Sequence, residues 1–426
     1  MTGERVLIVG DSLTGPTGFA VNGMNISWSL ARDYDVHYLG LQSYQTQKFQ
    51  IDLEGEKREI THHPNLPRAE NVEWDFGFKS LPYLLDTLKP DILLTINDIQ
   101  MIQHVPNTMC PDSINLKLMH LPAREFVSDD ELKMKLEGEV QKFKERYPRD
   151  TKWIAYCPQD GDPPMQTWSN IYRMADKVVA MSKYGKKIFS EYFNMDVPYI
   201  WHGVDSEKFK PADRSDKLGD MFVVGDINRN QPRKTPIRII RAFAQFAKDK
   251  NDVLLHMQKD WNDRFGWPLK YFTDIYGITN KCMKPSKVGM PREEVAKVYN
   301  AWDVNMMCTG GEGFGLAFAE SMMCGTPNIA NDYTTSKELI DDGWPRPRGL
   351  LTKYELYWQK LDEAAVRRSL VDIDDLVDKL NIYYNDRDKL KKHGENAYKW
   401  AKKNMSIKVQ QDDWNKLIKD TLNKEE

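Results

Sequence analysis

Two glutamates stand eight positions apart in a glycine-rich segment of this chain. Glu312 lies in the run Gly311-Glu312-Gly313-Phe314-Gly315, and Glu320 follows an apolar stretch. If the glycines form a strand-to-helix turn, backbone N–H groups and the positive end of a helix point at one place, which suits a phosphate. Carboxylates accept hydrogen bonds from sugar hydroxyls. The spacing therefore indicates a ligand with a central phosphate and hydroxyl-rich rings at both ends, such as a nucleotide-diphosphate sugar. An ordinary buried helix after a glycine-rich turn is the plain alternative.

A loop rich in cations follows an earlier predicted strand. The run Arg229-Asn230-Gln231-Pro232-Arg233-Lys234 lies between the apolar residues 221–224 and a helical pattern over 237–243. Negative charge builds on a departing diphosphate, and cations stabilise it. Arg can clamp two oxygens, whereas Lys acts as a point charge. This loop is therefore a candidate diphosphate site, with a basic surface loop as the alternative.

The sequence around the glutamates resembles the family 4 retaining glycosyltransferases (glycosyl transferases group 1), which have the GT-B fold. The resemblance covers residues 298–340, from Tyr299-Asn300-Ala301-Trp302 through the glutamates to Cys324-Gly325-Thr326-Pro327. It implies that Glu320 binds the ribose hydroxyls and that Glu312 contacts the transferred sugar. It also implies that three residues offer backbone N–H groups to the sugar and phosphate, namely Phe314, Gly315 and Leu316.

The same resemblance assigns roles to two other segments. It implies that Arg229 and Lys234 grip the diphosphate, and we expect Arg233 to be an extra cation turned to solvent. The segment 10–19 matches the family's glycine loop, which closes over donor and acceptor. In it, Gly15 and Gly18 would face the donor, and Thr17 and Phe19 the acceptor. Without a GxGxxG pattern, a mere strand-to-helix turn is the alternative.

Acidic and amide residues end two other predicted strands of the first half. Many family members have a histidine near the sugar where this chain has Asp160. Asp160 could hold a donor hydroxyl or stabilise an oxocarbenium-like centre by its charge. Asp160-Gly161-Asp162 also matches the DxD of metal-dependent glycosyltransferases, but the two-domain pattern argues against a metal. Asn97 and Asp98 follow another strand and are expected on the acceptor side.

Length and composition limit the class of protein. A chain of 426 residues suits two domains, and a formal charge of −3 provides no global positive field for nucleic acid or anionic lipid. The apolar run after Met1 is too short for a signal peptide, and no stretch is long enough for a transmembrane helix. The five cysteines form no CxxC pair. We therefore expect a cytoplasmic protein.

Short apolar runs separated by helical patterns predict parallel strands covered on both faces. The fold class expected is α/β, with two tandem Rossmann-like doubly wound domains (GT-B), an interdomain cleft and a C-terminal helix crossing back to the first domain. The expected parts are an acceptor-binding domain at 1–205 with a helical insertion at about 123–150, a linker at 206–220, a nucleotide-sugar-binding domain at 221–400 and a terminal helix at 401–426.

These features together predict a retaining glycosyltransferase that uses a UDP-, GDP- or ADP-linked sugar, with no metal and no cofactor. A non-catalytic nucleotide-sugar-binding protein and a sugar-nucleotide epimerase of GT-B shape are the alternatives. Nothing in the sequence identifies the acceptor, and nucleic acid is not indicated.

Overall fold

The computed structural model describes residues 3–41, 46–65, 76–109, 130–146, 150–166, 168–214, 218–285, 287, 289–343, 345–361 and 364–423. The chain forms two compact units. The first comprises Met1–Gly203, Lys360–Val366 and Ile407–Glu426, and the second comprises Val204–Gln359 and Arg367–Ser406.

The first unit is built on a mostly parallel sheet, because its central strands are continuous apolar runs buried on both faces. The strand order is β3-β4-β2-β1-β5-β6-β7, and only β3 is antiparallel to its neighbour. The strands are β1 (Arg5–Asp11), β2 (Asp35–Leu41), β3 (Gln47–Leu53), β4 (Glu56–Pro64), β5 (Ile92–Ile96), β6 (Lys152–Cys157) and β7 (Lys177–Ala180).

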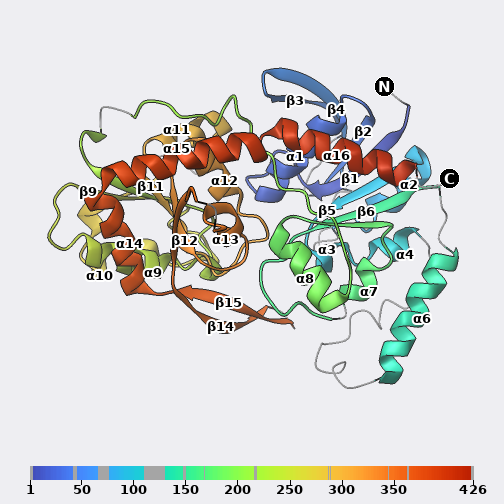
Figure 1. Cartoon of the computed structure of the whole chain (residues 1–426). Helices are drawn as coiled ribbons and strands as arrows, with labels where there is room; N and C mark the ends of the chain where they lie inside the picture. Colours follow the sequence, from blue (N-terminus) through green and yellow to red (C-terminus); the bar gives the residue numbers. More distant parts are fainter. Residues whose placement is uncertain are drawn as a thin grey trace. The chain divides into compact units, whose positions relative to one another are not determined.

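The described helices of this unit include one from the far end of the sequence. They are α1 (Gly18–Leu30), α2 (Ser80–Leu88), α3 (Ile99–Ile102), α4 (Val105–Met109), α6 (Asp130–Arg146), α7 (Trp168–Tyr172), α8 (Lys183–Phe193) and α16 (Ile407–Leu422). Helix α16 lies along α1 (Figure 1), where Gln410 Nε2 donates to Asn22 Oδ1 at 3.0 Å. The terminal helix therefore belongs to the first unit.

The second unit contains a parallel sheet of order β10-β9-β8-β11-β12-β13. Its strands are β8 (Phe222–Ile227), β9 (Val253–Gln258), β10 (Cys282–Met283), β11 (Val304–Met306), β12 (Asn328–Asn331) and β13 (Gly349–Thr352). The helices are η3 (Pro232–Lys234), α9 (Pro236–Phe246), α10 (Leu269–Ile275), η4 (Thr279–Lys281), α11 (Arg292–Asn300), α12 (Leu316–Met323), α13 (Thr335–Ile340), α14 (Ile373–Asn385) and α15 (Arg387–Asn404).

A close approach at Gly225 shows why a small residue stands in the central strand of this unit. A Cβ atom at Gly225 would lie 1.9 Å from the Trp302 ring. The indole Nε1 of Trp302 also donates to His256 Nδ1 at 3.0 Å, which fixes the ring against β9. Any side chain at position 225 would therefore displace Trp302 and disturb the packing beneath the loop that follows β8.

The sheets confirm the predicted α/β class with two doubly wound parts. Two pairs of strands were not predicted, namely β3 with β4 and the two-stranded sheet of β14 (Tyr354–Leu361) with β15 (Ala364–Val371). The expected linker 206–220 is grouped with the second unit, where Phe209 is buried and Arg214 pairs with Asp303 at 2.9 Å. Helix α6 lies within the expected insertion 123–150, of which residues 123–129 and 147–149 are outside the described residues.

Candidate functional site

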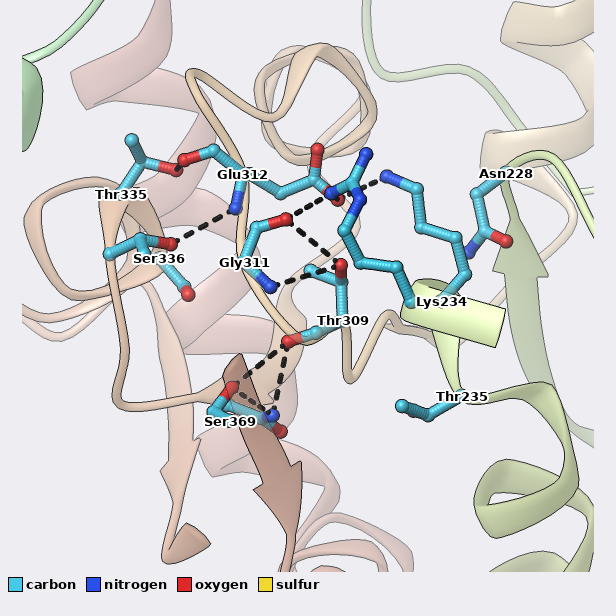
Figure 2. Close-up of polar contacts among 12 residues, drawn as sticks. Asn228, Lys234, Thr235, Thr309, Gly311, Glu312, Thr335, Ser336 and Ser369 are labelled. Carbon is cyan, nitrogen blue, oxygen red and sulfur yellow. Dashed lines mark hydrogen bonds and ion pairs between the residues drawn. The ribbon is translucent and has the colours of Figure 1, made fainter. Parts of the chain in front are cut away.

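The loop after β8 carries the basic residues and turns sharply into α9. Lys234 ends the short helix η3, and Thr235 follows with φ of +46°, a left-handed conformation that is costly for a β-branched residue. The Thr235 hydroxyl donates to the Cys308 carbonyl, which holds this turn against the segment after β11. The turn buries the Lys234 side chain and leaves it facing Glu312 (Figure 2).

Glu312 is a buried carboxylate held by two cations. Lys234 Nζ forms an ion pair with Glu312 Oε1, and Arg233 Nη1 lies 3.5 Å from the same oxygen. Burial alone would raise the pKa of Glu312, but the charges of Lys234 and Arg233 outweigh burial, and the pKa lies below its usual value. Glu312 is therefore ionised at neutral pH.

A hydrogen-bond network fixes the backbone on which Glu312 stands. The Thr309 carbonyl accepts from Asn331 Nδ2 at 3.1 Å and from Ser369 Oγ at 3.2 Å. The Gly311 N–H donates to Thr309 Oγ1 at 3.4 Å, and the Glu312 N–H donates to Thr334 Oγ1 at 3.1 Å. Figure 2 shows the contacts of Thr309 with Gly311 and Ser369. Asn331 lies on β12 and Ser369 on β15, so the network ties both strands to the loop after β11. The loop is thus held by side chains distant in sequence, which sequence reasoning did not identify.

The glycine turn continues into α12 as the motif predicted. Gly315 has φ of +88°, and a Cβ atom there would lie 2.5 Å from the Phe318 ring, so both conformation and space require glycine. Phe314 and Leu316 flank this residue at the start of the helix. The first N–H groups of any helix have no partner within it, so they can bind an anion.

Glu320 lies about one turn along α12 and is also buried. Arg292 Nη2 forms an ion pair with Glu320 Oε1, and the Tyr299 hydroxyl donates to Oε2 at 3.1 Å. The Arg292 guanidinium also lies over the Phe209 ring, 4.7 Å from its centroid. Sequence reasoning missed Arg292, which begins α11 and lies before the stretch 298–340 that carries the resemblance.

The structure places the two arginines of the basic loop in different surroundings, and only Arg233 differs from the expectation. Arg233 is not turned to solvent, because its guanidinium donates to the Gly311 carbonyl and approaches Glu312. Arg229 is more exposed, and its Nε lies 3.2 Å from Asp263 Oδ2. The structure therefore gathers Arg233 and Lys234 at Glu312 and places Arg229 against another loop.

A second buried ion pair lies beneath the same loop. Lys259 Nζ pairs with Asp226 Oδ2, and both side chains are fully buried. Asn228 joins them, because its Nδ2 donates to Asp226 Oδ1 at 2.7 Å and its Oδ1 accepts from Lys259 at 2.8 Å. Burial raises the pKa of Asp226 and lowers that of Lys259. The pair ties the beginning of the basic loop to β9.

In the first unit, the predicted site residues follow three neighbouring strands. Strands β1, β5 and β6 are adjacent and parallel, so their carboxyl ends meet at one edge of the sheet. The segments that follow them contain Gly15, Thr17, Gly18 and Phe19 after β1, Asn97 and Asp98 after β5, and Asp160 after β6.

Local bonds shape these segments of the first unit. Thr17 is the N-cap of α1: its Oγ1 accepts from the Ala20 N–H at 3.0 Å and donates to Asp11 Oδ2 at 2.6 Å. The buried Asn97 accepts from the Asp98 N–H at 2.9 Å. The Thr17 hydroxyl thus supports the glycine loop itself.

Within the described ranges, no group of three His, Cys, Asp or Glu side chains is arranged to hold a metal ion. Among the helices described, none has both the length and the apolar composition to cross a membrane.

Most of the second unit matches a known sequence family. Residues 209–400 match the model of the family described as glycosyl transferases group 1. A D-inositol 3-phosphate glycosyltransferase of Segniliparus rotundus is 27% identical over 168 residues, which is 37% of this chain and 37% of that protein. The chain thus aligns with little more than a third of this curated relative.

Solved structures match almost the whole chain. Sucrose-phosphate synthase from Thermosynechococcus elongatus has a TM-score of 0.68 at 14% identity, over 98% of each chain. The Anabaena protein HepE, solved with UDP and glucose, has a TM-score of 0.66 at 14% identity, over 98% of this chain and all of that one. The chain therefore has the GT-B fold. Its residues 209–400 match the glycosyl transferases group 1 family, and this match confirms the resemblance to the family 4 enzymes.

Proposed function

We propose that this chain is a retaining glycosyltransferase that moves a hexose from a nucleotide-diphosphate sugar to an acceptor hydroxyl without a metal ion. The observation that carries the proposal is the meeting of Lys234 and Arg233 at Glu312, directly before the helix that carries Glu320. Two cations and a helix N-terminus at one place suit a diphosphate, and the two carboxylates suit hydroxyls on either side of it.

The reaction follows from this arrangement. The acceptor oxygen forms a bond to the anomeric carbon while the bond from that carbon to the diphosphate oxygen breaks. The electron pair stays on the diphosphate, and a diphosphate oxygen takes the hydroxyl proton. Lys234 and Arg233 would stabilise the charge that develops on the leaving group. Attack from the side of the leaving group gives retention of configuration.

We assign the nucleoside end of the donor to Glu320. Its buried carboxylate can accept hydrogen bonds from two ribose hydroxyls, and it would then contact Arg292 and the ribose at the same time. HepE was solved with UDP and glucose, and this supports UDP-glucose as the first donor to test. Arg229 would contribute a second diphosphate contact after leaving Asp263.

The acceptor would be bound by the first unit, through Thr17, Phe19, Asn97 and Asp98. Asp160 would stabilise positive charge on the reacting sugar, a contribution made mainly in the transition state. Asp160→Asn should therefore lower kcat by about tenfold or more while changing the donor KM little. Steady-state kinetics test this, and an unchanged kcat would show that Asp160 only shapes its loop.

Donor turnover distinguishes the candidate functions. UDP-, GDP- and ADP-glucose are incubated with the protein, with and without EDTA, and products are followed by NMR. Slow hydrolysis of one donor that persists in EDTA, accelerated by an acceptor and giving an α-linked product, supports the proposal. An epimerised donor would indicate an epimerase, and binding without turnover a binding protein. Loss of turnover in EDTA with recovery in Mn²⁺ would contradict metal independence.

A further inference from the structure

The second unit has a pocket of about 320 Å³ beside the basic loop, where Pro232 and Thr235 line it and flank Arg233 and Lys234 in the sequence. It lies beside β14 and β15, one of the two pairs of strands that the sequence did not predict. The volume is at the low end of the range for small-molecule sites, which suits a small ring rather than a nucleotide sugar. Its lining residues are Pro232, Thr235, Ile237, Arg238, Trp267, Tyr357, Gln359 and Leu370.

The walls of the pocket are mainly apolar and include two aromatic rings. Trp267 comes from the loop before α10 and is 39% exposed, so its indole face is accessible. Tyr357 comes from β14, and burial raises the pKa of its phenol, which is therefore neutral. Aromatic faces pack against the C–H groups of a ring, and the phenol hydroxyl can form a hydrogen bond.

Two side chains of this pocket, Gln359 and Arg238, have polar atoms without a hydrogen-bond partner among the described residues. In the described part of the chain, Gln359 Oε1 is buried and accepts no hydrogen bond. A buried amide oxygen without a donor is costly, so a ligand hydroxyl at this point would be favourable. Arg238 uses its Nε to bind the Val371 carbonyl at 2.8 Å, and its terminal nitrogens make no hydrogen bond to described residues. The pocket thus offers both an acceptor and donors.

The charges near Arg238 balance, whereas two further cations, Arg368 and Arg233, act on Tyr357. The guanidinium of Arg238 is near one further cation, Arg241, and near two carboxylates, Glu355 and Asp372. An anionic ligand would gain from Arg238 but would be repelled by the two carboxylates. A neutral ligand with hydroxyl groups satisfies both Gln359 and Arg238 without adding charge.

We propose that this pocket binds a neutral saccharide ring, at a site separate from the donor site formed by Lys234, Glu312 and Glu320. The ring stacks on Trp267, one hydroxyl donates to Gln359 Oε1, and another accepts from Arg238. Binding at this site does not depend on the proposed transfer reaction.

Saturation-transfer NMR on the whole protein tests the proposal. The probes are maltotriose, cellotriose and triacetylchitotriose, each at millimolar concentration in excess UDP, whose uridine signals report occupation of the donor site. We expect at least one probe to bind in the presence of UDP, and at least a fivefold loss of its signal in both Trp267→Ala and Gln359→Leu. Trp358→Ala is the matched control, because Trp358 is the neighbour of both Tyr357 and Gln359 on β14 but is 63% exposed and does not line the pocket.

Several results would overturn the proposal. One is the absence of saturation transfer to every probe, and another is a signal that Trp358→Ala weakens as much as the pocket variants do. A signal that disappears when UDP is added would place the saccharide in the donor site instead. Melting curves of each variant identify misfolding, and Trp267→Ala removes a partly exposed ring and so provides a test if Gln359→Leu fails to fold. If UDP does not bind, this result contradicts the proposed transferase function but not the saccharide site.

Discussion

The two carboxylates of the glutamate motif are both buried, but they are neutralised in different ways. Glu312 receives two cations, Lys234 and Arg233, from the single loop after β8. Glu320 receives one cation, Arg292, from α11 and a hydroxyl from Tyr299. A buried charge must be paired to persist, so each partner set is part of its carboxylate's function.

This difference separates two tasks. The cations at Glu312 are those proposed to neutralise the leaving diphosphate, so changes there should act on the transition state. Both partners of Glu320 lie on α11 and have no proposed part in the reaction, so changes there should act on donor binding in the ground state. Measurements of turnover and of donor affinity on variants at either carboxylate can therefore test this division of tasks.

The largest effect is expected from Lys234→Ala. This variant removes a cation from the leaving group and leaves Glu312 with Arg233 alone, so turnover should fall by about 10²–10³-fold. Donor affinity should also weaken by roughly 1–3 kcal/mol. Lys270→Ala is a control, because Lys270 makes only an exposed pair with Asp274. Equal turnover in Lys234→Ala and Lys270→Ala would show that Lys234 is not part of the site.

Glu320→Gln should mainly affect binding. A neutral amide accepts weaker hydrogen bonds from ribose hydroxyls than a carboxylate, so UDP affinity should fall by about 1–3 kcal/mol with a small change in kcat. Calorimetry with UDP measures this loss. The exposed Glu395 on α15 provides the control substitution Glu395→Gln. A large fall in kcat at unchanged UDP affinity would reverse the roles assigned to the two glutamates.

Arg292→Met tests the role of the partner of Glu320 separately, because it removes the cation and leaves both glutamates of the motif unchanged. The free carboxylate should be less well oriented, so we expect UDP affinity to fall by about three- to tenfold, less than in Glu320→Gln. Arg292→Lys should restore part of the loss by returning the charge. In the double variant with Glu320→Gln, the Arg292 substitution should cost almost nothing more, whereas additive losses would show that Arg292 acts elsewhere.

The smallest effect is the change of stability with pH. The histidines and Glu312 contribute to it in different pH ranges. Burial and the neighbouring histidines lower the pKa of His63 to about 4, and burial lowers that of His256 to about 4. Unfolded histidines titrate near 6.5, so the unfolded state binds more protons below that pH and stability falls between about pH 6.5 and 4. The lowered pKa of Glu312 contributes stability that is present above the unfolded value and lost only at more acidic pH.

Melting temperatures measured between pH 7 and 4.5 test this prediction. The wild type should lose several degrees as the pH falls, at about 2–4 °C per kcal/mol for units of this size. His63→Gln should lose less over the same range, because it has no titrating ring at this position. Parallel curves for the two proteins would show that His63 does not drive the acid sensitivity.

The sequence predicted the fold well where strands are continuous apolar runs, as in Val6 to Val9 and Val253 to Met257. It did not predict β3 with β4, because exposed charged residues interrupt their apolar positions. It also missed β14 and β15, where Leu356 and Trp358 are exposed and the alternation of buried and exposed residues is weak. Strands stabilised mainly by their partners leave little pattern in their own residues.

At the site, the sequence identified residues that are close together along the chain. Glu312, Gly315 and Glu320 were readable because a turn and a helix fix their spacing. The pairing of Glu320 with Arg292 depends on the packing of α11 against α12, and the position of Arg233 depends on the turn at Thr235. Local spacing carries no information about such contacts.

The most direct test of the central claim is a crystal structure of the protein with UDP. The account predicts a ribose hydroxyl within hydrogen-bond distance of a Glu320 carboxylate oxygen and diphosphate oxygens next to Lys234 and the N-terminus of α12. Arg292 should still contact Glu320 in that complex. UDP bound elsewhere, or bound with Glu320 and Lys234 both free of it, would contradict the account.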